Sequence, residues 1–198
     1  MSRPITPGGA RRSVARWVSI VAHPFVTTLA LAGAVTSAGG AAAAVRTTTA
    51  VGVLFVLPLA LLTARQVRRG AWSTVDASHP PERRILFAVG GAGLLALLAY
   101  FARSQPGTPL VRGVAGVLVM VGVCAAVTPW VKVSLHMAAA ALAATVLLGR
   151  GLPLGWLLVA TLPVLGWSRV ALGRHRWSEV VLGLVLGACT GAIVARLG

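Results

Sequence analysis

His175 and Glu179 lie four residues apart near the end of the chain, beside several arginines. On a helix, this spacing places both side chains on one face within hydrogen-bond reach. A carboxylate bound to one imidazole nitrogen fixes the tautomer and leaves a free lone pair on the other nitrogen, which suits a nucleophile or a base. The forked donors of Arg169, Arg174 and Arg176 match phosphate oxygens. The segment therefore predicts chemistry on a phosphate, although Arg174 and Arg176 alone are equally typical of a positive loop at a helix end.

A second segment offers polar side chains at alternate positions, Lys132, Ser134 and His136. A second histidine that faces His175 would be placed to protonate a leaving oxygen, as cleavage of a phosphate ester requires. Taken by itself, His136 is more typical of a histidine with ordinary polar partners at the start of a membrane helix. The segment therefore indicates catalysis only in combination with the segment that contains His175 and Glu179.

A third polar segment contains Asp76, Glu82, Arg83 and Arg84. The two arginines would add donors for an anion. We expect Asp76 and Glu82 to orient these arginines, with capping of the following helix as the alternative. His23 precedes a proline inside an apolar run, and its position in the sequence favours a helix kink or helix packing over chemistry.

A metal site is the main chemical alternative, because His136, His175 and Glu179 could form a set of two histidines and one carboxylate. The neighbouring cations, Arg169 and Lys132 among them, would repel a divalent metal and hold an oxyanion. The chain has neither an HExxH motif nor a cysteine-based metal motif. The sequence therefore predicts an anion site with no metal and no other cofactor.

The composition shows what kind of scaffold must hold these residues. The chain has 198 residues, of which 57% are hydrophobic and only 11% are charged, and its mean hydropathy is +0.87. These values exclude a disordered chain and argue against a soluble globular domain. The net charge of +15 does not indicate nucleic-acid binding, because the cations separate long apolar runs instead of clustering on one polar face. The composition indicates an all-α, polytopic membrane protein.

The apolar runs predict six or seven membrane helices, since a crossing needs about 20 mostly apolar residues. They follow a basic N-terminal arm, residues 1–16, and together form a single transmembrane domain, residues 17–198. The expected helices span residues 17–39, 47–64, 85–102, 110–127, 133–148, 154–167 and 178–197.

Counting the crossings places the three polar segments on one side of the membrane. They follow the second, the fourth and the sixth expected helix, so each returns to the side of the N-terminus. All three acidic residues of the chain fall in these segments. Ionisable residues close to a bilayer are costly and indicate function.

The spacing of Ser168-Arg169, His175 and Glu179 resembles the third signature of the type 2 phosphatidic acid phosphatase and vanadium haloperoxidase superfamily. That signature ends in aspartate, where this chain has Glu179. The stretch 133–136, Val-Ser-Leu-His, is similar to its second signature, Pro-Ser-Gly-His. The first signature, lysine followed six residues later by Arg-Pro, is matched only by Arg83 or Arg84, and no lysine stands at that spacing. The resemblance covers residues 76–198.

This resemblance implies a role for each matching residue. His175 would attack phosphorus and form a phosphohistidine, Glu179 would orient it, and His136 would protonate the leaving lipid alcohol. Further residues would hold the phosphate oxygens, namely Arg169, Ser134, Arg83 or Arg84, and, as a source of the missing charge, Lys132. The superfamily requires no metal. The implied substrate is a lipid phosphomonoester or diphosphate, such as phosphatidate, phosphatidylglycerol phosphate or a polyprenyl phosphate or diphosphate.

Two other functions stay open at this point: a lipid-phosphate-binding or scaffold protein with impaired catalysis, and a small-anion transporter. We expect a multi-pass protein of the plasma (inner) membrane that binds lipid phosphate and no nucleic acid. Outside the site residues, the side of the N-terminus carries seven arginines and the other side five. This excess favours a cytoplasmic site. The sequence does not indicate an oligomeric state.

Overall fold

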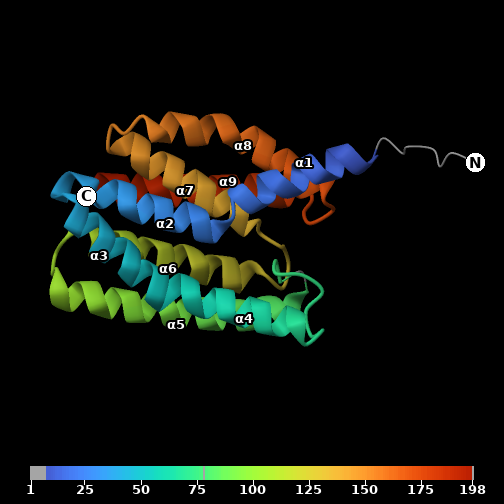
Figure 1. Cartoon of the computed structure of the whole chain (residues 1–198), viewed down its shortest axis with the longest axis horizontal. Helices are drawn as coiled ribbons and strands as arrows, with labels where there is room; N and C mark the ends of the chain where they lie inside the picture. Colours follow the sequence, from blue (N-terminus) through green and yellow to red (C-terminus); the bar gives the residue numbers. More distant parts are fainter. Residues whose placement is uncertain (1–7, 78, 198) are drawn as a thin grey trace, which may run out of the picture.

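The computed structural model describes residues 8–77 and 79–197, and this part of the chain is an all-α bundle (Figure 1). Within these described residues, six helical segments are long and apolar enough to cross a membrane. They are Gly9–Gly39, Ala41–Arg68, Pro80–Ser104, Pro109–Val127, Leu154–Ala171 and Trp177–Leu197, and a seventh, shorter apolar helix is Leu135–Gly149. The prediction of an all-α multi-pass membrane protein is confirmed.

The first crossing segment is broken in the middle. Helix α1 (Gly8–Val21) ends just before His23, and α2 (Pro24–Thr36) begins just after it. Proline has no N–H and fixes φ near −65°, so it is tolerated in the first turn of a helix but not in its interior. Helix α1 also takes in residues 8–16 of the expected basic arm, whereas residues 1–7 lie outside the described part of the chain.

The second crossing segment contains a local change of helix type. A turn of π-helix, labelled η2 (Gly52–Val56), joins α3 (Ala41–Val51) to α4 (Leu57–Arg68). Pro58 cannot donate to the carbonyl of Leu54, four residues earlier, which favours such a bulge. Helix α5 (Pro80–Ser104) comes close at this point, because a Cβ on Gly93 would lie 2.8 Å from the oxygen of Leu54. The glycine thus permits close packing of α5 on the π turn.

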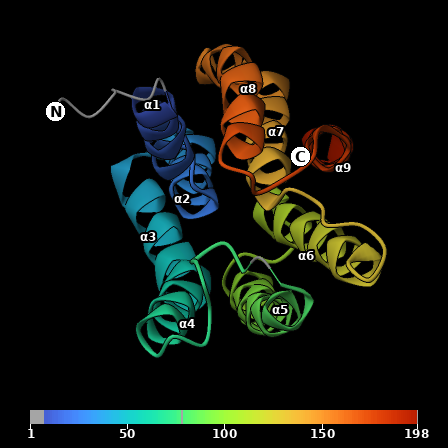
Figure 2. The ribbon, with the colours of Figure 1, turned by 90° about the vertical axis from the view of Figure 1, so that its right-hand side faces the viewer.

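The short helix α7 (Leu135–Gly149) forms the centre of the other half of the bundle and is buried along most of its length. Around it lie α6 (Pro109–Val127), α8 (Leu154–Ala171) and α9 (Trp177–Leu197), seen end-on in Figure 2. Helix α9 presents Gly183, Gly187 and Gly191 to α7, and a Cβ on Gly187 would clash with the carbonyl oxygen of Ala138. Small residues allow such close approach of helices in lipid. The contact fixes the starts of α7 and α9 side by side.

The connections α4–α5, α6–α7 and α8–α9 lie together at one end of the bundle, on the right in Figure 1. Hydrogen bonds join them, including one from the Lys132 ammonium to the Arg174 carbonyl at 2.9 Å. The three polar segments of the sequence therefore meet, as the crossing count predicts. We call this end of the bundle the polar end.

Candidate active site

The predicted His175–Glu179 pair forms, but not on one helix as the spacing argument assumed, because His175 lies in the α8–α9 connection and α9 begins at Trp177. Nδ1 of His175 lies 2.8 Å from Oε2 of Glu179, and the His175 side chain is only 5% exposed. The chain reverses just before this pair, because Gly173 has φ +66°, and the His175 N–H donates to the Arg169 carbonyl at 3.3 Å. The backbone N–H of Arg176 donates to the same Glu179 oxygen at 3.2 Å. Glu179 therefore holds Nδ1 and leaves Nε2 for chemistry.

The surroundings of His175 keep its imidazole neutral. Burial lowers the pKa of His175 from 6.5 to about 4, and the positive charges of Arg169 and Lys132 act in the same direction. The hydrogen bond to Glu179 opposes this shift but does not cancel it. At neutral pH the ring therefore has a free lone pair, which nucleophilic attack requires.

Arg169 is the most buried cation of the site, with a side chain that is 1% exposed. Its Nη2 donates to Oδ2 of Asp76 at 2.9 Å, its Nη1 donates to the hydroxyl of Ser19, and its buried Nε has no partner. Burial disfavours the charged form of Asp76, yet the charge and hydrogen bond of Arg169 bring the net pKa of Asp76 below 3.8. Asp76 therefore stays ionised and orients Arg169.

This pairing corrects the expectation that Asp76 would orient Arg83 or Arg84. The chain folds Asp76 back onto the end of α8, and Nε of Arg174, in the α8–α9 connection, also lies 3.7 Å from its Oδ2. Glu82 likewise orients neither arginine through a described bond, but accepts the backbone N–H of His79 at 3.1 Å. The capping alternative explains Glu82.

Arg83 and Arg84 point to different places, because neighbouring residues on a helix are turned by about 100°. Arg83 is 2% exposed, and its Nη2 donates to the Val133 carbonyl at 3.1 Å. It lines the same cavity as His175. Arg84 is exposed and lines a separate hollow beside Pro129. Of the two candidates, Arg83 is the one at the site.

Of the three candidate residues just before and at the start of α7, only one lines the cavity. His136 is 5% exposed, lines the cavity, and has a buried Nε2 without a partner. Ser134 is fully buried and its Oγ has no partner, but the side chain is not part of the cavity wall. Lys132 ties its segment to the α8–α9 connection and is likewise absent from the cavity wall. Burial, together with the charge of Arg83, lowers the pKa of Lys132.

His23 is the site residue that the sequence interpretation missed. Its ring centre lies 5.1 Å from that of His136, and it lines the same cavity. Its Nδ1 accepts the N–H of Phe25 at 3.2 Å and caps α2, which places the proton of the neutral ring on Nε2. A histidine within a membrane span is itself a sign of function, and this was the available signal.

These side chains surround a cavity of about 130 Å³ between α2, α5, α6 and α7. Its charged and titratable lining residues are His23, Asp76, Arg83, His136, Arg169 and His175. The wall therefore carries two buried arginines and three histidines, against one carboxylate that Arg169 already binds, and this balance of charge suits an anion.

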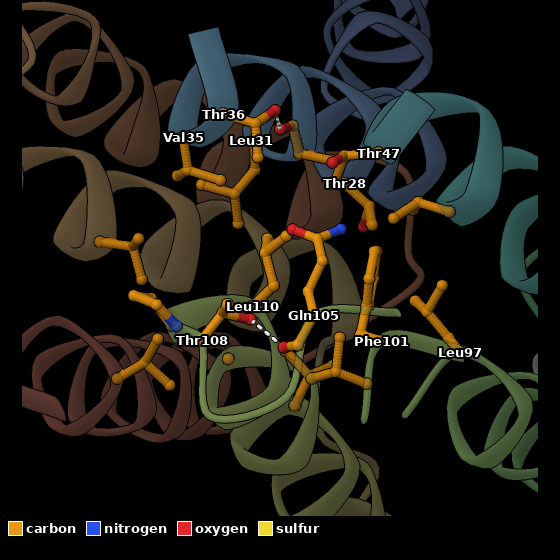
Figure 3. Close-up of a pocket in the computed structure, with 18 of the residues that line it drawn as sticks. Thr28, Leu31, Val35, Thr36, Thr47, Leu97, Phe101, Gln105, Thr108 and Leu110 are labelled. Atoms are coloured by element: carbon orange, nitrogen blue, oxygen red, sulfur yellow. Dashed lines mark hydrogen bonds between the residues drawn. The ribbon is translucent and has the colours of Figure 1, made fainter. Parts of the chain in front are cut away.

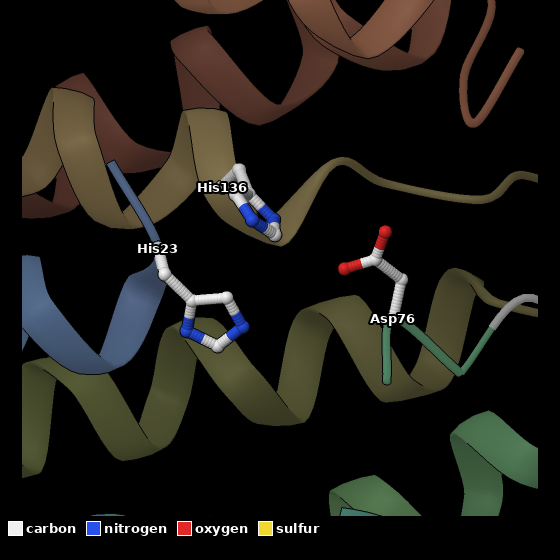
Figure 4. Close-up of side chains that lie close together, drawn as sticks. All are labelled: His23, Asp76 and His136. Carbon is white, nitrogen blue, oxygen red and sulfur yellow. The ribbon is translucent and has the colours of Figure 1, made fainter. Parts of the chain in front are cut away.

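One group among the described residues has the geometry of a metal site. The ligand atoms of His23, Asp76 and His136 all lie within 4.8 Å of one another (Figure 4). This set differs from the alternative considered for the sequence, which combined His136 with His175 and Glu179. Because Arg169 binds the Asp76 carboxylate and Arg83 adds a second charge to the wall, the site disfavours a divalent cation and favours an oxyanion.

Comparison with curated proteins gives one short similarity. Over 58 residues the chain is 48% identical to decaprenylphosphoryl-5-phosphoribose phosphatase from two strains of Mycobacterium tuberculosis, CDC 1551 / Oshkosh and H37Rv. The matched stretch covers 28% of this chain and 31% of the length of each relative. No protein-family model matches the chain, and no solved structure matches it.

Proposed function

We propose that this protein is a membrane phosphatase that hydrolyses the phosphate ester or diphosphate of a lipid. The observation that carries the proposal is the neutral His175, held by Glu179 beside an anion cavity with two buried arginines. The resemblance of the motifs to the type 2 phosphatidic acid phosphatases and the short similarity to a lipid-linked phosphoribose phosphatase support it.

The proposed reaction has two steps. In the first, Nε2 of His175 attacks phosphorus and the bond from phosphorus to the lipid oxygen breaks. His136, which takes up a proton together with the bound phosphate and acts as the imidazolium, donates that proton to the leaving oxygen. In the second, His136 takes a proton from water, the resulting hydroxide attacks the phosphohistidine, and inorganic phosphate leaves. The phosphorus–nitrogen bond breaks in this step and returns the lone pair to His175.

The rest of the wall stabilises charge on the phosphoryl group as it transfers. Arg169 and Arg83 are buried, so their positive charges act strongly on an anion in the cavity. His23 adds an Nε2–H donor on the side of His136. Glu179, one methylene longer than aspartate, still reaches Nδ1 at 2.8 Å and so fills the orienting role. This scheme uses no metal.

Phosphate release from purified protein tests the proposal. The substrates are phosphatidate, phosphatidylglycerol phosphate and polyprenyl mono- and diphosphates in detergent, with EDTA present. We expect turnover of at least one lipid by wild type, and loss of about 10³-fold or more in His175→Ala. His79→Ala is the matched control, because His79 is an exposed histidine at the same end of the bundle. Saturable lipid binding without turnover would favour the scaffold alternative and refute the enzyme.

A further inference from the structure

The N-terminal helix reaches the candidate active site through Ser19. Helix α1 packs against α8, and the two helices lie side by side in both views of the bundle (Figure 1, Figure 2). Arg11 and Ser19 share one face of α1 and both contact α8, the first through the ring of Trp167, 5.7 Å from its guanidinium carbon. Ala15, between them on this face, is fully buried. Ser19 is 8% exposed and lies at the end of α8 that carries Arg169.

Arg169 is held at two of its three guanidinium nitrogens. Nη1 donates to the Ser19 hydroxyl on α1, and Nη2 donates at 2.9 Å to the Asp76 carboxylate in the α4–α5 connection. The third nitrogen, Nε, is buried and has no hydrogen-bond partner among the described residues. Buried N–H groups are almost always paired, so an unpaired one beside a cavity indicates a ligand that supplies the acceptor. Nε is therefore the donor that Arg169 offers to an anion in the cavity that it lines.

Two anchors on Arg169 are needed to aim this donor. A guanidinium is planar, so hydrogen bonds at two of its nitrogens fix the direction of the third N–H, whereas one bond leaves the plane free to turn. Asp76 supplies the first anchor and Ser19, from a different helix, supplies the second. A hydroxyl suits the second position because it is uncharged. A second carboxylate there would cancel the positive charge that attracts the phosphate.

We propose, on the basis of the proposed phosphatase function, that Ser19 is a positioning residue for the reaction. Its hydroxyl fixes the plane of Arg169, so that Nε is already aimed at the phosphoryl group when negative charge develops there. Ser19 lies outside residues 76–198, the region that resembles the phosphatase superfamily, and none of the matched motifs contains it. Helix α1 is thus part of the active site as well as a membrane segment.

Substitution of Ser19 tests this role. Ser19→Ala removes the anchor and little else, because alanine is the best helix former. With the lipid that wild type hydrolyses fastest, we expect kcat/KM to fall about 10-fold in Ser19→Ala at an unchanged melting temperature. Ser19→Thr keeps the hydroxyl and should stay within about 3-fold of wild type. Ser13→Ala is the matched control, because Ser13 is an exposed serine on the same helix.

Binding of inorganic phosphate gives a second measurement that needs no turnover. The dissociation constant is obtained from the rise in melting temperature with phosphate concentration, for purified protein in detergent. We expect it to increase about 3-fold or more in Ser19→Ala, because Arg83 still attracts the anion while Nε of Arg169 is no longer aimed at it. Ser13→Ala should bind phosphate as wild type does.

A double-mutant cycle shows whether Ser19 acts through Arg169. Arg169→Lys keeps the positive charge but removes the planar fork that the two anchors hold. We expect Ser19→Ala to change kcat/KM and phosphate binding by less than about 2-fold in the lysine background. Equal losses in the two backgrounds would show that Ser19 does not act through Arg169, and would overturn the inference.

The remaining outcomes separate this inference from the proposed function. If Ser19→Ala equals wild type in both measurements, or Ser19→Thr loses as much as Ser19→Ala, the hydroxyl does not position Arg169 and the inference is wrong. If wild type hydrolyses none of the lipids but Ser19→Ala still weakens phosphate binding, the phosphatase proposal fails while the anchoring of Arg169 by Ser19 stands.

Discussion

At the scale of single residues, the site is a set of groups whose charge states are set by burial. His175 is kept neutral among cations, while Asp76 is kept ionised by Arg169. A neutral nucleophile beside fixed positive charge suits attack on a phosphate dianion, because the wall attracts the substrate and the lone pair is already free. The proposed chemistry depends on both charge states, the neutral imidazole of His175 and the ionised carboxylate of Asp76 that orients Arg169.

The low pKa of His175 predicts a dependence of stability on pH. The folded protein titrates His175 near 4 and the unfolded chain near 6.5, so the unfolded state binds more protons between these values. Stability from this group is therefore complete above pH 6.5 and is lost as the pH falls toward 4. We expect the melting temperature of wild type to fall more steeply from pH 6.5 to 5 than that of His175→Gln, measured in detergent. Parallel curves for the two proteins would contradict the shift.

His23 is expected to serve the reaction as well as to cap α2. Asparagine is a good capping residue and would keep the bond to the Phe25 N–H, but its amide does not reach as far into the cavity. We expect His23→Asn to retain the melting temperature of wild type and to lose about 10²-fold in kcat. If His23→Asn keeps full activity, capping is the whole role of His23.

At the scale of helices, the packing of α9 on α7 positions the reacting groups. His136 lies in the first turn of α7 and Glu179 in the first turn of α9, and the backbone N–H of Ser134 donates to the Glu179 carbonyl at 3.2 Å. The glycine contacts below this bond leave almost no space between the two helices. The relative placement of the two histidines thus follows from a contact between small residues.

Filling that contact should destabilise the protein. We expect Gly187→Val to cost about 1–3 kcal/mol, because its side chain would meet the backbone of Ala138. Gly122→Val is the matched control, since a Cβ on this helical glycine meets nothing within 4 Å. Thermal unfolding in detergent compares them. Equal melting temperatures for the two variants would show that the α7–α9 contact is not tight.

The helices and their contacts also show which features could be predicted from the sequence and which could not. Apolar runs and their crossing count predicted the helices and the common end of the polar segments, because both follow from helix length in a bilayer. The His175–Glu179 pair was predictable since it is local. The approach of His23 to His136, the pairing of Asp76 with Arg169, and the choice of Arg83 over Arg84 depend on how distant helices turn toward one another. No local pattern contains that information.

At the scale of the whole molecule, the protein joins a polar end to an apolar interior. The positive side chains that give the net charge of +15 do not all lie on one exposed surface, because the two arginines at the site, Arg83 and Arg169, are buried. Three residues in the wall of the cavity that these arginines line, Thr28, Phe55 and Val117, also line a larger neighbouring cavity of about 350 Å³ whose walls are mostly apolar (Figure 3).

The central claim is that His175 carries the phosphoryl group, and trapping the intermediate tests it most directly. The protein is mixed with ³²P-labelled polyprenyl phosphate, quenched in alkali, in which phosphohistidine survives, and digested for peptide mapping. We predict label on the peptide that contains His175 in wild type and in His79→Ala, and none in His175→Ala. Label on a different residue, or undiminished phosphate release by His175→Ala, would contradict the account.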